Sequence, residues 1–211
     1  MFILSETTRE LPIPPVAFGI TAFAVFSFLL YIVLRFDKSE PLLKLGLYGG
    51  TFDPIHNGHT HVITQLIQRG IVDHLLVVPA GEPRLRENAP KATGAQRRTM
   101  CQLAINDLPP EIRSKVEVNP IEILRMGPSY TIDTVEAIRQ AYPDDEIVLI
   151  IGTDAHEKIG QWHRVDELLS MVTLEVIERP GSFTGLGREI DAIDLSATQV
   201  RLGQADQLSP S

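Results

Sequence analysis

The sequence predicts an α/β fold, namely a doubly wound parallel sheet of the Rossmann-like kind, preceded by a single N-terminal apolar helix. Short apolar runs alternate with amphipathic helical stretches from residue 44 onward, which is the pattern of repeated βαβ units. Runs such as HLLVVPA (74–80) and EIVLIIG (146–152) are apolar at successive positions, as strands buried on both faces must be. The N-terminal helix is predicted from residues 16–34, which carry no charge.

The elements follow one another in a regular order, and glycine or proline marks many of their ends. The expected strands are LKLGLYG (43–49), HLLVVPA (74–80), KVEVNPIEI (115–123), EIVLIIG (146–152), VTLEVIER (172–179) and IDAID (190–194). The expected helices are GHTHVITQLIQRG (58–70), AQRRTMCQLAIND (95–107), SYTIDTVEAIRQAY (129–142) and SATQVRLGQ (196–204). Ser129 or Thr131 is a candidate N-cap of the third helix, and Ser196 is a candidate N-cap of the fourth. Parallel sheets bind ligands at the carboxyl ends of their strands, so we expect the site near Gly50, Gly81 and Gly152.

Residues 16–34 allow three interpretations. A cleaved signal peptide needs a positively charged start, whereas the first fifteen residues hold Glu6, Glu10 and only one basic residue, Arg9. A helix of the main core needs a solvated polar face, which an uncharged stretch does not provide. A membrane anchor fits best, because nineteen residues at about 1.5 Å each span about 28 Å, close to the thickness of the bilayer core.

We therefore expect four regions, namely a tail at 1–15, a transmembrane helix at 16–34, a linker at 35–43 and one folded domain at 44–211. Arg35, Lys38 and Lys44 follow the apolar stretch, so the positive-inside rule places the folded domain in the cytoplasm. The alternative is a start codon chosen too far upstream, in which case the folded domain would be soluble and cytoplasmic without an anchor.

Charge and cysteine content exclude several classes of function. The formal net charge is −8, which argues against a nucleic-acid-binding surface. Cys101 is the only cysteine, so no intrachain disulfide can form, and its apolar neighbours in TMCQLAI predict a buried structural thiol. No cluster of cysteine and histidine has the spacing of a zinc site, and we expect no metal site in the protein.

GGTFDPIHNGH, residues 49–59, comes directly after the first expected strand. Gly49 and Gly50 allow the backbone to approach a ligand more closely than a Cβ would permit. His56 and His59 are three positions apart at the start of the next helix, so they lie on the same side of it. The helix N-terminus adds unpaired N–H groups and a positive partial charge. Together these features predict a polyphosphate site, although either histidine alone would be explained as structural.

The same stretch carries the HxGH signature of the nucleotidyltransferase superfamily, and in full it resembles bacterial nicotinate-nucleotide adenylyltransferases. Further segments of that family occur in the expected order and spacing, namely GPSYTIDTVEAI, IIGTDA, the tryptophan at 162, ERPG and LSATQVR. The resemblance covers about residues 44–203. It implies a Rossmann-like nucleotidyltransferase that transfers an adenylyl group from ATP to nicotinate mononucleotide, giving deamido-NAD and pyrophosphate in NAD biosynthesis. Mg²⁺ would accompany ATP.

The resemblance also implies roles for particular residues. His56 and His59 would be the catalytic pair that meets the ATP phosphates, with His59 closest to the α-phosphate. Thr131 would bind the carboxylate of nicotinate mononucleotide, and Trp162 would stack on its pyridine ring. The ATP-binding residues would be Gly49, Gly50, Thr51, Phe52, Gly152, Asp154, Ser196, Thr198 and Arg201. Structural alternatives are a core position for Trp162 and capping roles for Thr131 and Ser196.

Two departures from the family pattern leave questions open. First, PAGEPRLREN stands where many family members have a PPHK-like element, and Arg84 or Arg86 could supply the phosphate contact there. Second, the chain after residue 203 is shorter than in the family pattern. The rival functions are a related adenylyl- or cytidylyltransferase with another phosphorylated acceptor, and an inactive membrane-tethered nucleotide-binding module. Nicotinamide mononucleotide is a further possible acceptor. The oligomeric state is not predicted.

Overall fold

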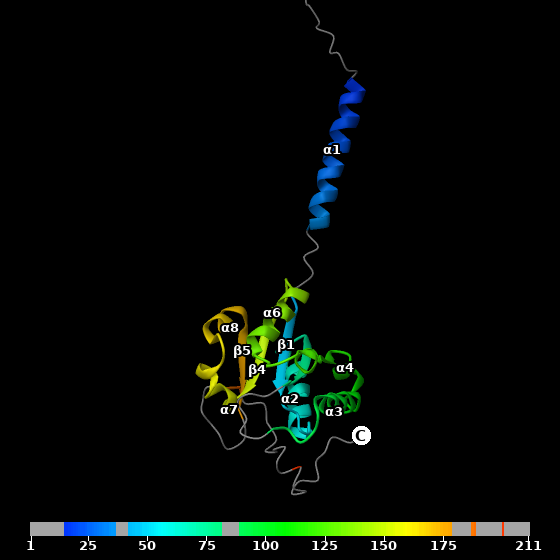
Figure 1. Ribbon diagram of the computed structural model, residues 1–211. Coiled ribbons are helices and arrows are strands. Elements are labelled where there is room, and N and C mark those ends of the chain that lie inside the picture. Colours follow the sequence, from blue (N-terminus) through cyan, green and yellow to red (C-terminus); the bar gives the residue numbers. More distant parts are fainter. Residues whose placement is uncertain (1–14, 37–41, 82–88, 179–186, 189–199, 201–211) are drawn as a thin grey trace, which may run out of the picture. The chain divides into compact units, whose positions relative to one another are not determined.

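Five parallel strands form the centre of the folded part of the chain, in the order β3-β2-β1-β4-β5 (Figure 1). The computed structural model describes residues 15–36, 42–81, 89–178, 187–188 and 200. The strands are β1 (Lys44–Gly50), β2 (His74–Pro79), β3 (Val116–Val118), β4 (Glu146–Gly152) and β5 (Thr173–Ile177). The chain divides into two compact units, residues 1–41 and residues 42–211, and the sheet belongs to the second.

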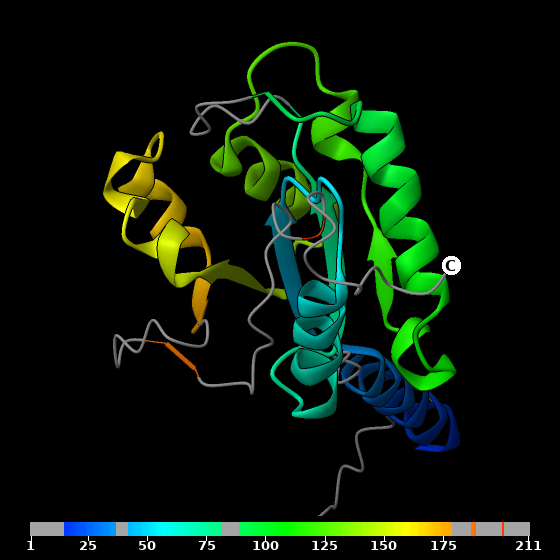
Figure 2. The ribbon, with the colours of Figure 1, turned by 90° about the horizontal axis from the view of Figure 1, so that it is seen from below.

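Helices cover both faces of the sheet (Figure 2). The longer ones are α2 (Asn57–Gln68), α3 (Gly94–Asn106), α6 (Thr131–Ala141) and α8 (Val165–Met171). The short ones are α4 (Pro110–Arg113), α5 (Ile121–Leu124), α7 (Thr153–His156) and the 3₁₀ turn η1 (Ile159–Gln161). α2 and α3 contribute to one hydrophobic cluster, and α6 and α8 contribute to the other. The doubly wound α/β fold is therefore confirmed.

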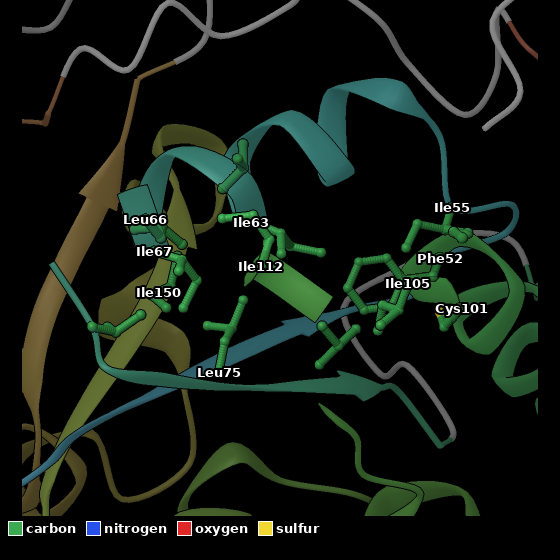
Figure 3. Packing of buried hydrophobic residues seen from close by; sticks show 14 of the residues in the cluster. Phe52, Ile55, Ile63, Leu66, Ile67, Leu75, Cys101, Ile105, Ile112 and Ile150 are labelled. Atoms are coloured by element: carbon green, nitrogen blue, oxygen red, sulfur yellow. The ribbon is translucent and has the colours of Figure 1, made fainter. Parts of the chain in front are cut away.

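Successive side chains of a strand point to opposite faces of the sheet, and this explains why helices cover both faces. In β4, Val148 and Ile150 belong to the cluster with α2 and α3, whereas Ile147, Leu149 and Ile151 belong to the cluster with α6 and α8. Figure 3 shows Ile63, Leu66 and Ile67 packed toward Leu75 and Ile150. Continuous apolar strands of this kind are stable only between two layers of helix, because each face must be kept from water.

The first unit contains α1 (Pro15–Phe36), so a helix lies where the apolar stretch predicted one. The side chains that the structure describes in α1 run from Gly19 to Tyr31 and are exposed. Within the described part of the chain, none of the helices combines the length and the apolar character that a membrane crossing requires. The transmembrane helix expected at residues 16–34 is therefore not supported.

Two local expectations were wrong. The strand expected at 115–123 ends at Val118, because Pro120 has no N–H for the sheet ladder, and residues 121–124 form the turn α5. Neither Ser129 nor Thr131 caps α6, whose N-cap is Tyr130 without a side-chain hydrogen bond. Residues 153–171 also contain α7, η1 and α8, which were not predicted from the sequence. The strand expected at 190–194 lies outside the described residues, as does the helix expected at 196–204 apart from Val200.

Cys101 gives a test of the core. Its side chain is buried against the sheet, and burial raises the pKa of the thiol to about 12 although the charge of Arg97 lowers it. We expect iodoacetamide at pH 8 to leave Cys101 unmodified in the native protein and to modify it fully in urea, as measured by mass spectrometry. Modification of the native protein at the rate of a free cysteine would contradict this packing.

Candidate active site

A cavity of about 180 Å³ lies at the carboxyl ends of β1 and β4. The strand order reverses between these two neighbours, and such a reversal opens a crevice above the sheet. The backbone of Gly49 and Gly50 lines the cavity from β1, and Gly152 lines it from β4. Thr131 from the start of α6 and Trp162 after η1 line it as well. The structure thus brings five of the predicted site residues into one cavity.

The turn after β1 is shaped by Gly50 and Phe52. A Cβ on Gly50 would lie 2.8 Å from the ring of Phe52, so this position requires glycine, whereas a Cβ on Gly49 would meet open space. Phe52 has a left-handed φ of 47° and is only 3% exposed, with its ring edge-on to Tyr48. The ring of Phe52 therefore belongs to the core, and only its backbone is available to line a nucleotide site.

His56 and His59 lie together at the start of α2. His56 is the N-cap residue, and the centroids of the two rings are 3.8 Å apart. The backbone N–H of His56 donates to Nδ1 of His59 at 3.2 Å. Because Nδ1 accepts this bond, the proton of neutral His59 is on Nε2, which is then a hydrogen-bond donor. The pair can therefore offer donors to an anion at the N-terminus of α2, where the helix dipole also favours negative charge.

A buried arginine joins the loops around the site. Arg97 on α3 is 2% exposed, and its guanidinium donates to the carbonyl oxygens of Thr51 at 2.8 Å and Gly81 at 3.2 Å. Its Nε donates to the carbonyl oxygen of Ala92 at 3.3 Å. The carboxylate of Asp53, 5% exposed, accepts the N–H groups of Lys91 and Ala92 at 2.9 and 3.1 Å. These bonds hold the turns after β1 and β2 against the start of α3.

A second polar cluster lies beside the cavity, on α5 and α6. The hydroxyl of Thr134 donates to the Glu122 carboxylate at 3.1 Å and accepts a hydrogen bond from Arg125 at 3.1 Å. Glu122 also accepts the N–H of Gly81 at 3.4 Å, and Arg125 donates to the hydroxyl of Ser129 at 2.9 Å. Glu122 and Thr134 line the cavity directly. The cluster therefore connects the end of β2 with the start of α6.

This second layer of residues was not predicted from the sequence, although one signal for it was present. Arg97 occupies the same helical face as Cys101 and Ala104, which are buried, and a charged residue on an apolar face usually has a partner. Asp53 lies within GGTFDPIHNGH, but no role was predicted for it. Glu122, Arg125 and Thr134 carry no such signal, because their contacts are set by how α5 lies against α6.

The other predicted site residues are not in the cavity. Asp154 on α7 is exposed and does not line it. Arg84, Arg86, Ser196, Thr198 and Arg201 lie outside the described residues. Val200, from the same predicted helix as the last three, lines a groove with Asp53 and Pro54. Among the described residues, no group of three or more histidine, cysteine, aspartate or glutamate side chains is arranged to hold a metal ion.

Comparisons with known proteins show the family of the chain. The cytidylyltransferase-like family matches residues 47–203. A Bacillus pumilus protein, named as a probable nicotinate-nucleotide adenylyltransferase, is 37% identical over 164 residues, which cover 75% of this chain and 84% of the relative. The nicotinate-nucleotide adenylyltransferase of Bacillus subtilis is 34% identical over 163 residues, with 75% and 84% covered.

Two solved structures share the fold. A Vibrio parahaemolyticus crystal structure has a TM-score of 0.58 at 19% identity and covers 80% of this chain and 88% of its own. The Plasmodium falciparum nicotinic acid mononucleotide adenylyltransferase complexed with NaAD has a TM-score of 0.57 at 23% identity, with 66% of each chain covered. The chain therefore belongs to the cytidylyltransferase-like family, in which its curated relatives are nicotinate-nucleotide adenylyltransferases, and the resemblance seen in the sequence is confirmed.

The contacts of Asp53 lead to a stability prediction. Asp53→Asn places an amide group where the carboxylate accepts two backbone N–H groups, so we expect a loss of about 1–3 kcal/mol in the free energy of unfolding. Urea denaturation followed by circular dichroism measures it, with Asp144→Asn at an exposed position as the matched control. Equal stability of the two variants would show that the Asp53 contacts do not hold the loop.

Proposed function

We propose that residues 44–211 form a catalytic domain that transfers the adenylyl group of ATP to nicotinate mononucleotide, in a step of NAD biosynthesis. The observation that carries the proposal is the single cavity in which Thr131 and Trp162 meet the glycine-rich end of β1. The histidine pair follows on the same turn of the chain. Relatives that are 34–37% identical bear the name of this activity.

The acceptor fits the side of the cavity formed by α6 and Trp162. Thr131 is the first residue of α6, where backbone N–H groups lack helical partners and the helix dipole favours an anion. The carboxylate of nicotinate would bind there, and its pyridine ring would stack on the indole of Trp162. Trp162 packs against the α6–α8 cluster, which gives the ring a fixed backing. Its Nε1 is buried without a hydrogen-bond partner in the described structure, so an acceptor atom of the ligand could accept a hydrogen bond from it.

ATP would bind on the side formed by the turn after β1 and the start of α2. The backbone of residues 49–52 would line the nucleotide, and His56 and His59 would donate to the phosphates. Gly152 and Asp154 would contact the adenosine part. Ser196, Thr198 and Arg201, with Arg84 or Arg86, would hold the β- and γ-phosphates, and this assignment follows from the family motifs alone.

The reaction is an in-line displacement at the α-phosphorus of ATP. A phosphate oxygen of nicotinate mononucleotide forms the new P–O bond, while the bond to the bridging oxygen breaks and its electron pair leaves with pyrophosphate. The attacking phosphate has a second pKa of about 6, so it is largely dianionic at neutral pH and needs no general base. The protein contributes by aligning both substrates and by donating hydrogen bonds to the charge that develops on the phosphates.

Mg²⁺ fits this site as a companion of ATP. The described residues offer no cage of carboxylates, and Mg²⁺ commonly keeps water and phosphate oxygens as ligands in nucleotide sites. When bound it would neutralise phosphate charge. The side chains of this protein would then need only to orient the phosphate groups, which suits the histidine pair at α2.

His59 is the first residue to test. We expect His59→Ala to lower kcat by about 10²–10³-fold, because a donor to the phosphates is lost. His59→Gln should keep more activity, since its amide nitrogen reaches a position close to that of Nε2. His61→Ala, on the same helix, is the matched control. Near-full activity of His59→Ala in a pyrophosphate-release assay would contradict the proposal.

Trp162 and the choice of acceptor can be tested together. Stacking of an aromatic ring contributes about 1–3 kcal/mol, so Trp162→Ala should raise the KM for nicotinate mononucleotide by about tenfold or more while the KM for ATP stays unchanged. Trp162→Phe should stay close to the wild type. Pyrophosphate release by the full chain is measured with nicotinate mononucleotide, nicotinamide mononucleotide and phosphopantetheine. Release with phosphopantetheine alone would show that Thr131 and Trp162 are wrongly assigned.

A further inference from the structure

The segment that carries Trp162 is joined to α6 by two contacts that have no role in the mechanism above. In the first contact, the ring of His163 lies against the ring of Tyr130, with 4.5 Å between the ring centroids and 34° between the ring planes. In the second, Arg164 donates to the carboxylate of Glu136 at 2.8 Å. Tyr130 directly precedes Thr131, and Glu136 lies further along the same helix. Both residues after Trp162 are therefore attached to the helix that begins with Thr131.

Arg164 has an unusual backbone conformation. Arg164 is the N-cap of α8 and has φ 51° and ψ 46°, a left-handed conformation that costs energy for a residue with a Cβ. This turn separates the Trp162 segment from α8. Arg164 also donates to Glu167 in the first turn of α8. These hydrogen bonds raise the pKa of Arg164 and lower the pKa of Glu167.

The two carboxylates that bind Arg164 have different structural consequences. Glu167 is three residues from Arg164, so that ion pair lies within one segment of chain. Glu136 is 28 residues away on α6, so that pair joins two separate elements. The side chains of Arg164 and Glu136 are each 37% exposed, and an ion pair with this exposure contributes little to folding stability. Its consequence is therefore expected in the position of the segment and not in the free energy of unfolding.

We propose that Arg164 and Glu136 are positioning residues of the acceptor pocket, whose ion pair sets the place of the Trp162 indole relative to Thr131. The inference rests on the proposed function, in which Thr131 binds the carboxylate of the nicotinate group and Trp162 stacks on its ring. Thr131 and Trp162 come from different elements, and both line the same cavity. A ring bound between them requires a fixed spacing, and the contacts of His163 and Arg164 with α6 supply it next to the cavity.

The test compares Glu136→Gln with Glu167→Gln in the full chain. Each variant removes the negative charge of one of the two carboxylates that accept hydrogen bonds from Arg164, but only the first weakens the connection to α6. We expect Glu136→Gln to raise the KM for nicotinate mononucleotide about fivefold, with the KM for ATP and kcat changed by less than about twofold. Glu167→Gln should change all three by less than about twofold. Urea denaturation should give both variants the stability of the wild type.

Fluorescence gives a second measurement, because Trp162 is the only tryptophan in the sequence. We expect Glu136→Gln to increase quenching by acrylamide and to shift the emission to longer wavelength, whereas Glu167→Gln leaves both unchanged. Combining Glu136→Gln with Trp162→Ala should raise the KM for nicotinate mononucleotide no further than Trp162→Ala does alone, because Glu136 acts through the indole.

The two proposals fail in different ways. If Trp162→Ala raises the KM for nicotinate mononucleotide but Glu136→Gln changes neither that KM nor the fluorescence, the inference about Arg164 and Glu136 is overturned and the proposed function stands. Additive effects in the double variant overturn the inference as well, since Glu136 would then act independently of Trp162. If Trp162→Ala leaves the KM unchanged, the acceptor assignment itself is wrong, and the positioning role falls with it.

Discussion

Parallel pairing holds β1 and β4 in register over five residue pairs, from Lys44–Glu146 to Tyr48–Ile150, and the rest of the site depends on it. Because the strand order reverses at this pair, the chain leaves β1 toward one face of the sheet and β4 toward the other. The glycines that end the two strands are thereby left beside an open space. A slip of this register would separate the glycine-rich turn from the pocket that contains Thr131 and Trp162.

Each side of this space is supported by its own set of contacts. On the side formed by the turn after β1, Arg97 donates to the carbonyl oxygen of Thr51 and Asp53 accepts the N–H of Lys91, so buried hydrogen bonds replace water around the loop backbone. On the side that contains Thr131 and Trp162, the support is the packing of α6 and α8, together with the hydrogen bond from Thr134 on α6 to Glu122 on α5. In the proposed function the substrates would meet where the two sides face each other, so their alignment would depend on both sets of contacts.

Much of this could be predicted from the sequence. The apolar strands, α2, α3 and α6 follow from periodicity, because a buried strand and an amphipathic helix leave different patterns of apolar residues. The HxGH motif located His56 and His59 at the start of a helix, since local spacing alone decides that position. Periodicity could not assign the helical turns at 153–171, which are too short to show a pattern, and it extended the third strand past Pro120.

The sequence by itself determined the class of fold and the family, because local patterns of apolar residues and short motifs are enough to recognise both. It also predicted which residues would touch the substrates, and that assignment stays a prediction. Only the tertiary structure decided which side chains support them. Arg97 reaches Thr51 across 46 residues, and Arg164 reaches Glu136 across 28. Contacts between residues so far apart in the sequence depend on the register of the sheet and on how the helices pack. Both result from the burial of many side chains together, which cannot be predicted from a local sequence pattern.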